Sequence, residues 1–594
     1  MAETMKTSIK GGGFLLEEVE ASDVFTPEEF TEEHRMIAKT TEDFVHGEVV
    51  PVIDRIENHE FDVSRELLTK AGELGLLGSD IPEKYEGLSL DKISSTLITE
   101  KFSPAGGFSL SHGAHVGIGT LPIVFFGNEE QKKKYLPDLA SGRKIAAYAL
   151  TEPSSGSDAL GAKTTAVLND EGTHYILNGE KQWITNSAFA DVFVVYAQID
   201  GEKFTAFIVE REYDGVSTGP EEKKMGIKGS STRTLLLEDV KVPKEHVLGE
   251  IGRGHIIAFN ILNIGRYKLG VGCLGGSKRA IELAASYATE RKQFNTPIAR
   301  FTTIQEKLGS MAAKTYALES SIYRTGGLFE EQLGGLTEEE QEDGSKIAKG
   351  IAEYAIECSL NKVYGSETLD FCTDEAVQIY GGYGFMAEYE VERAYRDSRI
   401  NRIFEGTNEI NRLLVPGTLI RKTMKGELPF LDKANGLQEE LMSFMPEEPG
   451  DEPLAKEKYL LENAKKIFLM GTGSAMQKYG EKIEDEQELL LNTADIVSEI
   501  YNMEAAIART EKAIGQHGVE KEAMKLLLTQ VICEEGLQNI EADAKESLIH
   551  MEEGDNLRTM LSMLRKLTRR TPVNVIAAKR DIAERIIDKK KYEV

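Results

Sequence analysis

The chain has 594 residues, of which 41% are hydrophobic and 28% charged, and its 70 basic and 99 acidic side chains give a net charge of −29. One hydrophobic core cannot serve a chain this long, so we expect several folded units. The acidic balance argues against a nucleic-acid-binding protein, which needs a basic surface. No two of the four cysteines form a Cys-x-x-Cys pair, which argues against a disulfide framework and a cysteine-rich zinc site.

No apolar run approaches the roughly 20 residues that a membrane-spanning helix needs. Residues 1–18 hold only the short apolar patch Phe14-Leu15-Leu16 and no arginine, so they resemble neither a secretory signal nor a transit peptide. We therefore expect a cytoplasmic protein.

The first part of the chain divides into three predicted segments. Residues 1–26 are predicted to be an extended leader that is flexible at Gly11-Gly12-Gly13. Thr26-Pro27-Glu28-Glu29 then predicts a helix start, with a hydroxyl cap, a first-turn proline and acids at the positive end of the dipole. Amphipathic stretches between glycines and prolines predict a helical domain over 27–145.

From 146 to 254 the pattern changes to a β domain. Short runs at 193–196, 204–209 and 234–237 are rich in β-branched and aromatic residues. Turn-forming pairs separate the runs, and this alternation is typical of strands and hairpins. The pairs are Asn178-Gly179, Asp200-Gly201 and Asp214-Gly215.

Helical periodicity returns over 255–425. Residues 426–453 contain four prolines and are predicted to be a linker. A charged helical segment, 454–594, follows, in which Ile496, Ile500, Met503 and Ile507 share one helix face. The expected fold class is therefore α+β, mainly α.

Two stretches of the β domain contain candidate binding residues. Residues 148–158 join a strand-like start to a turn of small hydroxyl residues, whose N–H and O–H groups can bond a planar heterocycle or a phosphate. An ordinary strand-to-loop corner is the commoner reading of such a turn. Trp183, the single tryptophan, can flank a flat cofactor, although taken alone a core aromatic is the commoner role.

Further candidates lie in the second helical region. Arg266 can clamp an anion or hold a catalytic acid, and a surface salt bridge is the alternative. Residues 291–294 contain cations that can simply cap a helix end. Residues 378–384 have three glycines in four positions, but they do not follow a strand, so a Rossmann nicotinamide site is a poor match.

Glu405 lies between Phe404 and Gly406 in a predicted interhelical loop with apolar neighbours. Removal from water raises the pKa of a carboxyl group and makes it a stronger base. Taken alone, a solvated loop glutamate remains the commoner reading.

The order of these motifs is more informative than any one of them. From about residue 30 to 425, the succession from Tyr148 through Trp183, Arg266 and Gln378 to Glu405 resembles the acyl-CoA dehydrogenase family, and the extra C-terminal segment is most similar to its very-long-chain branch. The resemblance implies an N-terminal helical domain, a β-barrel-like middle domain, a four-helix bundle and an additional C-terminal helical domain. It implies no metal.

The resemblance also implies roles for individual residues. Glu405 matches the catalytic base, and Gly265 leaves it without a rival at the position where some branches carry the glutamate. The substrate contacts are Ser157, Asn263, Arg266, Phe404 and Gly406. The positions that hold FAD are Tyr148, Leu150, Thr151, Gly156, Ser157, Trp183, Ile184, Thr185, Arg291, Gln293, Phe294, Gln378, Gly381, Gly382, Thr407, Asn408 and Glu409.

By resemblance, the reaction is the α,β-dehydrogenation of fatty acyl-CoA thioesters, with the long-chain ones of β-oxidation expected, and electrons pass to an electron-transfer flavoprotein. The extension 454–594 implies a homodimer. An acyl-CoA oxidase and a non-catalytic assembly protein on the same fold are the alternatives. For the basic stretches at 565–570 and 589–591 we favour a solvated helix face over contact with an anionic membrane.

Overall fold

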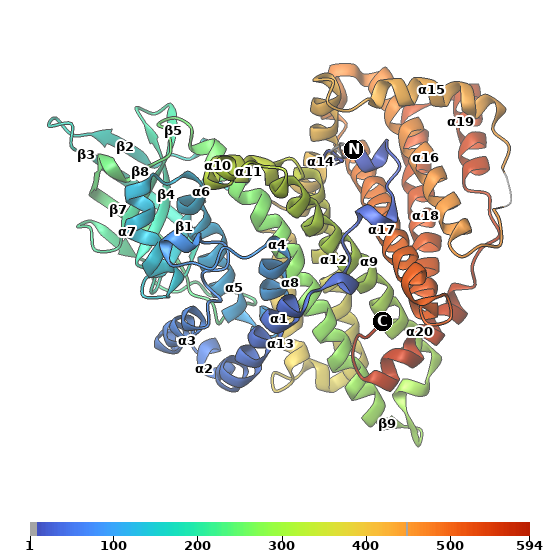
Figure 1. The fold of residues 1–594 in the computed structure, drawn as a ribbon, viewed down its shortest axis with the longest axis horizontal. Helices are drawn as coiled ribbons and strands as arrows, with labels where there is room; N and C mark the ends of the chain where they lie inside the picture. Colours follow the sequence, from blue (N-terminus) through green and yellow to red (C-terminus); the bar gives the residue numbers. More distant parts are fainter. Residues whose placement is uncertain (1–8, 447–448) are drawn as a thin grey trace.

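The computed structural model describes residues 9–446 and 449–594. A β-sheet lies at one end of the molecule, long helices form the middle, and the C-terminal helices form the other end (Figure 1). Within the described ranges, no helix combines the length and the apolar character needed to cross a membrane.

The leader packs against the helical regions. Its first eight residues lie outside the described part of the chain, and the rest runs beside α17 (Gln487–His517) in short turns (Figure 1). The expected flexibility at the three glycines is wrong, because a Cβ on Gly11 would lie 2.0 Å from the Glu353 carbonyl oxygen and Gly12 has φ +79°. Glycine is needed there for close backbone packing.

The N-terminal domain is helical, as predicted. Thr26 caps only the short turn Pro27–Glu29, and α1 begins after a second capping box formed by Thr31 and His34. The helices are α1 (Glu32–Phe44), α2 (Ile53–Glu57), α3 (Phe61–Glu73), α4 (Lys92–Phe102), α5 (Gly107–Ala114), α6 (Leu121–Phe126) and α7 (Glu129–Ala140).

The middle domain is one sheet with the order β6-β7-β3-β2-β4-β5-β8, and β1 pairs in parallel with β4. Its strands are β1 (Ala146–Ala149), β2 (Thr165–Leu168), β3 (His174–Thr185), β4 (Val192–Ile199), β5 (Lys203–Glu210), β6 (Val216–Thr218), β7 (Thr232–Pro243) and β8 (Val247–Leu248). The turn predicted at Asn178-Gly179 is wrong, because the pair lies inside β3 where the register against β7 shifts. A β-bulge needs the same permissive residues as a tight turn.

The third domain is built on α8, which packs along α12 and α9. Its elements are α8 (Gly254–Glu290), the hairpin β9 (Lys292–Gln293) and β10 (Thr296–Pro297), α9 (Thr302–Gly334), α10 (Glu338–Glu342), α11 (Gly344–Ala352), α12 (Ala355–Tyr380), α13 (Glu390–Ser398) and α14 (Asn408–Met424).

The segment predicted as a linker is not a linker throughout, because it contains α15 (Phe430–Ser443). Leu428, Phe430, Leu437 and Leu441 are buried in the same core as α16, so the prolines mark only the ends of this helix. The remaining helices are α16 (Ala455–Tyr479), α17 (Gln487–His517), α18 (Ala523–Met551), α19 (Gly554–Leu567) and α20 (Val575–Lys589).

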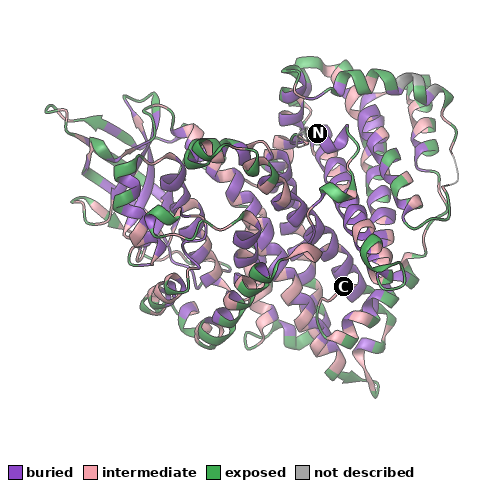
Figure 2. Cartoon of the chain, viewed as in Figure 1, coloured by how far each residue is buried: buried purple, intermediate pink, exposed green. Residues whose placement is uncertain are grey.

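The C-terminal helices share one hydrophobic core with the bundle. The predicted apolar face of α17 is confirmed, since Ile496, Ile500, Met503 and Ile507 are all buried. Figure 2 shows buried residues running from the bundle into these helices. The C-terminal extension is therefore a part of the folded body.

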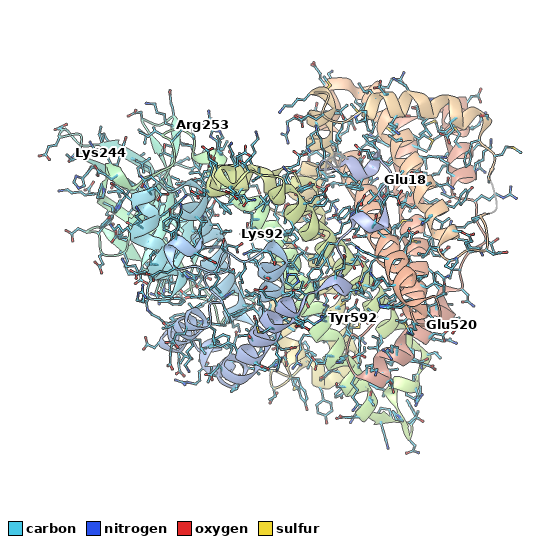
Figure 3. All side chains as sticks on the ribbon, in the orientation of Figure 1. Glu18, Lys92, Lys244, Arg253, Glu520 and Tyr592 are labelled. Carbon is cyan, nitrogen blue, oxygen red and sulfur yellow. The ribbon has the colours of Figure 1, made fainter. Side chains whose placement is uncertain are left out.

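Buried ion pairs add polar links between the regions. Asp80 accepts hydrogen bonds from Lys92 (2.6 Å) and Lys268 (2.9 Å), which join the N-terminal domain to α8, and Figure 3 shows Lys92 at this junction. Glu319 of α9 similarly accepts from Arg509 of α17 (2.7 Å) and from the hydroxyl of Tyr592 near the chain end (2.8 Å). Their cationic partners hold the pKa values of both carboxyls well below the usual range, although burial acts in the opposite direction.

Candidate active site

Glu405 lies in a tight loop between α13 and α14. Its backbone has φ +57°, the left-handed region that a residue with a side chain rarely adopts, and Gly406 follows with φ +81°. Thr407 then caps α14, because its Oγ1 accepts a hydrogen bond from the Ile410 N–H at 3.3 Å. Strained backbone of this kind is held by its surroundings and clusters at functional sites.

The carboxyl group of Glu405 is partly removed from water, in a residue that is half-buried as a whole. Its Oε2 is buried and has no hydrogen-bond partner among the described residues. Burial raises the pKa of Glu405, and the charges of Arg266 and Lys362 act in the opposite direction. A Cβ added to Gly265 would lie 2.8 Å from this Oε2, so any larger residue would push the carboxyl out of its present position.

Arg266 lies against the same loop, where the resemblance puts it. It is buried on α8, and its Nε donates to the Glu405 carbonyl oxygen at 3.2 Å. Its Nη1 donates to Asn263 Oδ1, also at 3.2 Å. Arg266 thus bonds the backbone of the loop and leaves the carboxylate free for chemistry.

Glu405 opens into a cavity of about 260 Å³. Phe404, Gly265 and Thr185 line it beside Glu405, and lining residues continue along α8 to Leu283. At 1.5 Å per residue, the 18 residues from 265 to 283 correspond to about 27 Å of helix. Small residues keep this channel open, namely Gly113, Ala114, Gly117, Gly272, Gly276 and Ala280.

The two predicted flavin stretches of the middle domain are neighbours. The Gln182 N–H donates to the Thr151 carbonyl oxygen at 2.8 Å, and the buried Lys181 Nζ bonds Glu152 Oε1 at 2.7 Å and the Leu150 carbonyl oxygen at 3.2 Å. Trp183 is 60% exposed with φ +59°, so the alternative of a core aromatic is wrong.

These residues fit a flat aromatic group. The Tyr148 hydroxyl is buried without a hydrogen-bond partner in the described chain, and a Cβ on Gly156 would meet nothing within 4 Å. Leu150 and Ile184 are buried beneath, and Ser157 is exposed. An exposed indole can stack on a flat ring such as an isoalloxazine, the small loop residues leave room for it, and the unpartnered hydroxyl can bond its edge.

A second set of predicted FAD contacts lies at the far end of α8. Arg291, Gln293 and Phe294 belong to the hairpin after α8, and the Arg291 guanidinium lies 5.5 Å from the ring centre of Tyr383, beside the exposed Gln378, Gly381 and Gly382. Along α8, the 26 residues from Gly265 to Arg291 span about 39 Å. One chain therefore does not bring this set to its own Glu405.

The predicted FAD contacts at 407–409 differ in their exposure. Glu409 is exposed at the start of α14. Asn408 is buried, with its Nδ2 donating to Glu367 at 2.9 Å and its Oδ1 accepting from Lys362 at 2.7 Å. Within the described chain, the Asn408 side chain bonds α12 and fixes the loop, and its contact with the cofactor stays a prediction.

The sequence interpretation missed Lys362 and Asn411. The Asn411 amide donates to the carbonyl oxygens of Glu405 (3.3 Å), Gly406 (2.9 Å) and Thr407 (3.0 Å). No local signal marks Lys362, because it lies 44 positions before Gly406 and reaches the loop only through the packing of α12 on α14. Asn411 lies only six positions after Glu405, so its contact with the loop is local. Among the described residues, no cluster of His, Cys, Asp and Glu is arranged to hold a metal.

Comparison with known proteins decides the family. Models of the acyl-CoA dehydrogenase N-terminal domain match residues 31–143, of the middle domain 147–240, and of the C-terminal domain 252–419 and, separately, 463–566. A "Probable acyl-CoA dehydrogenase" of Bacillus subtilis (strain 168) is 69% identical over 594 residues, which is 100% of both chains. The chain belongs to the acyl-CoA dehydrogenase family.

Two further relatives bear on the cofactor and the branch. A crystal structure of acyl-CoA dehydrogenase complexed with FAD from Bacillus anthracis has a TM-score of 0.98 and 69% identity, covering 99% of this chain and 100% of that one. The mitochondrial very long-chain specific acyl-CoA dehydrogenase of Macaca fascicularis is 37% identical over 76% of this chain and 71% of its own. The protein is thus an FAD-dependent enzyme of this family.

Proposed function

We propose that this enzyme dehydrogenates long-chain fatty acyl-CoA thioesters between Cα and Cβ, with Glu405 as the base, to give trans-2-enoyl-CoA in fatty-acid β-oxidation. The observation that carries the proposal is the Glu405 carboxyl at the head of a long cavity, with its Oε2 buried and unpartnered among the described residues. A base in this position takes a proton from a carbon held in that cavity.

The protein contributes proton removal and charge stabilisation. The water-poor surroundings raise the pKa of Glu405 and strengthen it as a base for the α-proton. The Glu405 backbone N–H donates to no acceptor in the described chain, so it is available to the thioester oxygen as negative charge develops there. When bound, FAD supplies the hydride acceptor for Cβ.

The shape of the cavity supports a long acyl chain. Its lining follows about 27 Å of α8, and glycine or alanine occupies many of the positions where a larger side chain would close the channel. An apolar chain gains binding energy in proportion to the apolar surface that it buries. A channel of this length therefore favours long substrates over short ones.

The exposed end of the bundle supports a homodimer. Phe294 and Phe385 are 90% and 80% exposed, and such aromatic side chains are typical anchors of protein interfaces. The residues Arg291, Gln293, Gln378, Gly381 and Gly382 beside them would hold the adenosine diphosphate part of the partner subunit's FAD. We further propose an electron-transfer flavoprotein as the acceptor, as the family resemblance implies, and a cytoplasmic location.

The test is an anaerobic titration of the purified holoenzyme with butyryl-, octanoyl-, palmitoyl- and stearoyl-CoA, followed by flavin absorbance. We expect bleaching by the two longer thioesters at lower concentration and higher rate. Faster bleaching by butyryl-CoA would contradict the long-chain assignment, and no bleaching by any of the four would contradict the reaction. Peroxide formed in step with turnover in air would indicate an oxidase.

A further inference from the structure

The carbonyl groups of the Glu405 loop accept hydrogen bonds from three helices. The Glu405 oxygen accepts from Arg266 Nε of α8 at 3.2 Å, and the Gly406 oxygen accepts from Lys362 Nζ of α12 at 2.8 Å. Asn411 of α14 also reaches both oxygens. Because these bonds fix the peptide planes, they hold Glu405 in its left-handed conformation with its side chain in the cavity.

Lys362 differs in its partners from most of the other buried lysines in the described part of the chain. Lys181, Lys422 and Lys465 each have a carboxylate at 2.5–2.7 Å. The fully buried Lys362 bonds only neutral oxygens, the Gly406 carbonyl and Asn408 Oδ1, and it forms no ion pair in the described chain.

A buried charge without a direct counter-ion is costly, and burial lowers the pKa of Lys362 to about 8. The side chain therefore stays protonated at neutral pH, and its charge acts on the nearby Glu405 carboxyl. The cost of burying this cation is offset when Glu405 is ionised. The protonated lysine and the ionised glutamate favour each other across the loop.

We propose that Lys362 is a positioning residue, which anchors the Glu405 loop through the Gly406 carbonyl and supplies, together with Arg266, the positive charge that keeps the Glu405 carboxyl ionised. The inference rests on the proposed role of Glu405 as the base. The groups that face this pair are Arg266 and Cys273 of α8, Glu367 of α12, Glu409 of α14 and the Tyr148 hydroxyl of β1.

The test separates the charge of Lys362 from its hydrogen bonds. Lys362→Arg keeps the charge and a donor, Lys362→Gln keeps a donor without charge, and Lys362→Met keeps neither. The rate of anaerobic flavin reduction by palmitoyl-CoA is measured in single turnovers across a pH range. The rate rises with pH as Glu405 loses its proton, so this acid limb reports the pKa of the base.

Removing a nearby cation raises the pKa of a carboxyl group. We expect the acid limb to move up by about 1 pH unit in the Gln and Met variants and to stay in place in the Arg variant. The Met variant should also lose more of the plateau rate than the Gln variant, because its loop lacks the anchor.

Lys465→Met is the matched control. It removes another buried lysine, bonded to Glu504 on the C-terminal helices, and should lower thermal stability without moving the acid limb. An unmoved limb in both the Gln and Met variants, or an equal shift in Lys465→Met, overturns the inference. If Lys362→Met does not fold, the comparison of Gln with Arg decides. Failure of the wild type to reduce its flavin would instead overturn the proposed function.

Discussion

The loop around Glu405 and the hairpin around Phe294 lie at two distant points along α8, and their surroundings differ. At Glu405, three successive carbonyl groups have internal donors, and a glycine makes room for the carboxyl. At Phe294, the aromatic ring and the nearby glycines are exposed. One chain brings together the groups around Glu405, whereas the proposed adenosine-binding residues lie on an exposed surface that we propose a second copy completes.

The largest expected effect concerns the loop around Glu405. Glu405→Gln keeps the shape of the side chain and removes the base, so flavin reduction by palmitoyl-CoA should slow by at least about 10²–10⁴-fold. Stopped-flow absorbance measures the rate, and FAD content should stay equal to that of the wild type. Glu462→Gln, an exposed change on α16, should keep the wild-type rate. A normal rate in Glu405→Gln would show that the base lies elsewhere.

Gly265→Ala tests how closely the helix fits the carboxyl. The added Cβ lies 2.8 Å from Glu405 Oε2, so the carboxyl must move, and a displacement of about 1 Å costs roughly 10²-fold in rate. The same reduction assay measures the loss. Gly417→Ala on α14 is the control, since its Cβ would meet nothing within 4 Å. Equal rates in the two variants would contradict the packing argument.

Adding charge to the exposed surface around Phe294 tests the proposed dimer interface. Phe294→Asp combined with Phe385→Asp should weaken the proposed dimer by about 30-fold for each side chain replaced, because each aromatic anchor buried in an interface is worth about 2 kcal/mol. Sedimentation velocity measures the association, and FAD retention on gel filtration should fall with it. Met424→Asp, another exposed apolar position, serves as the control. An unchanged monomer–dimer equilibrium would remove these two residues from the interface.

The smallest effect concerns stability. Burial raises the pKa of Glu405 in the folded protein, so the unfolded chain loses this proton at lower pH and folding stability falls as the pH rises through that window. Glu405→Gln should therefore melt at a higher temperature than the wild type at pH 7. Calorimetry should show the difference in melting temperature disappearing as the pH falls below about 4.3, the pKa of glutamate in an unfolded chain. A gap that does not change with pH would show that burial of the Glu405 charge is not its cause.

Patterns that depend on neighbouring residues were readable from the sequence. The runs at 193–196 and 204–209 lie in β4 and β5, and the apolar face predicted at 496–507 is buried on α17. The turn at Asn178-Gly179 and the linker at 426–453 were misread. In both, the local composition is ambiguous, and pairing with β7 or packing on α16 decides the outcome.

The site divides in the same way. The sequence pointed to Glu405, Arg266 and Gly265 through the order of motifs, and the structure brings these three together. It gave no hint of Lys362, nor that the Asn408 side chain turns inward to it. Contacts between α12 and the loop depend on the packing of helices that are distant in the chain.

By itself, the sequence determined the family, the succession of helical and sheet regions and the identity of the acidic residue, because composition, periodicity and motif order are properties of the chain. Only the tertiary structure decided which groups surround that residue. Burial and the distance to a charge set the pKa of a carboxyl, and both depend on how residues 139 positions apart, such as Arg266 and Glu405, come to share one small volume.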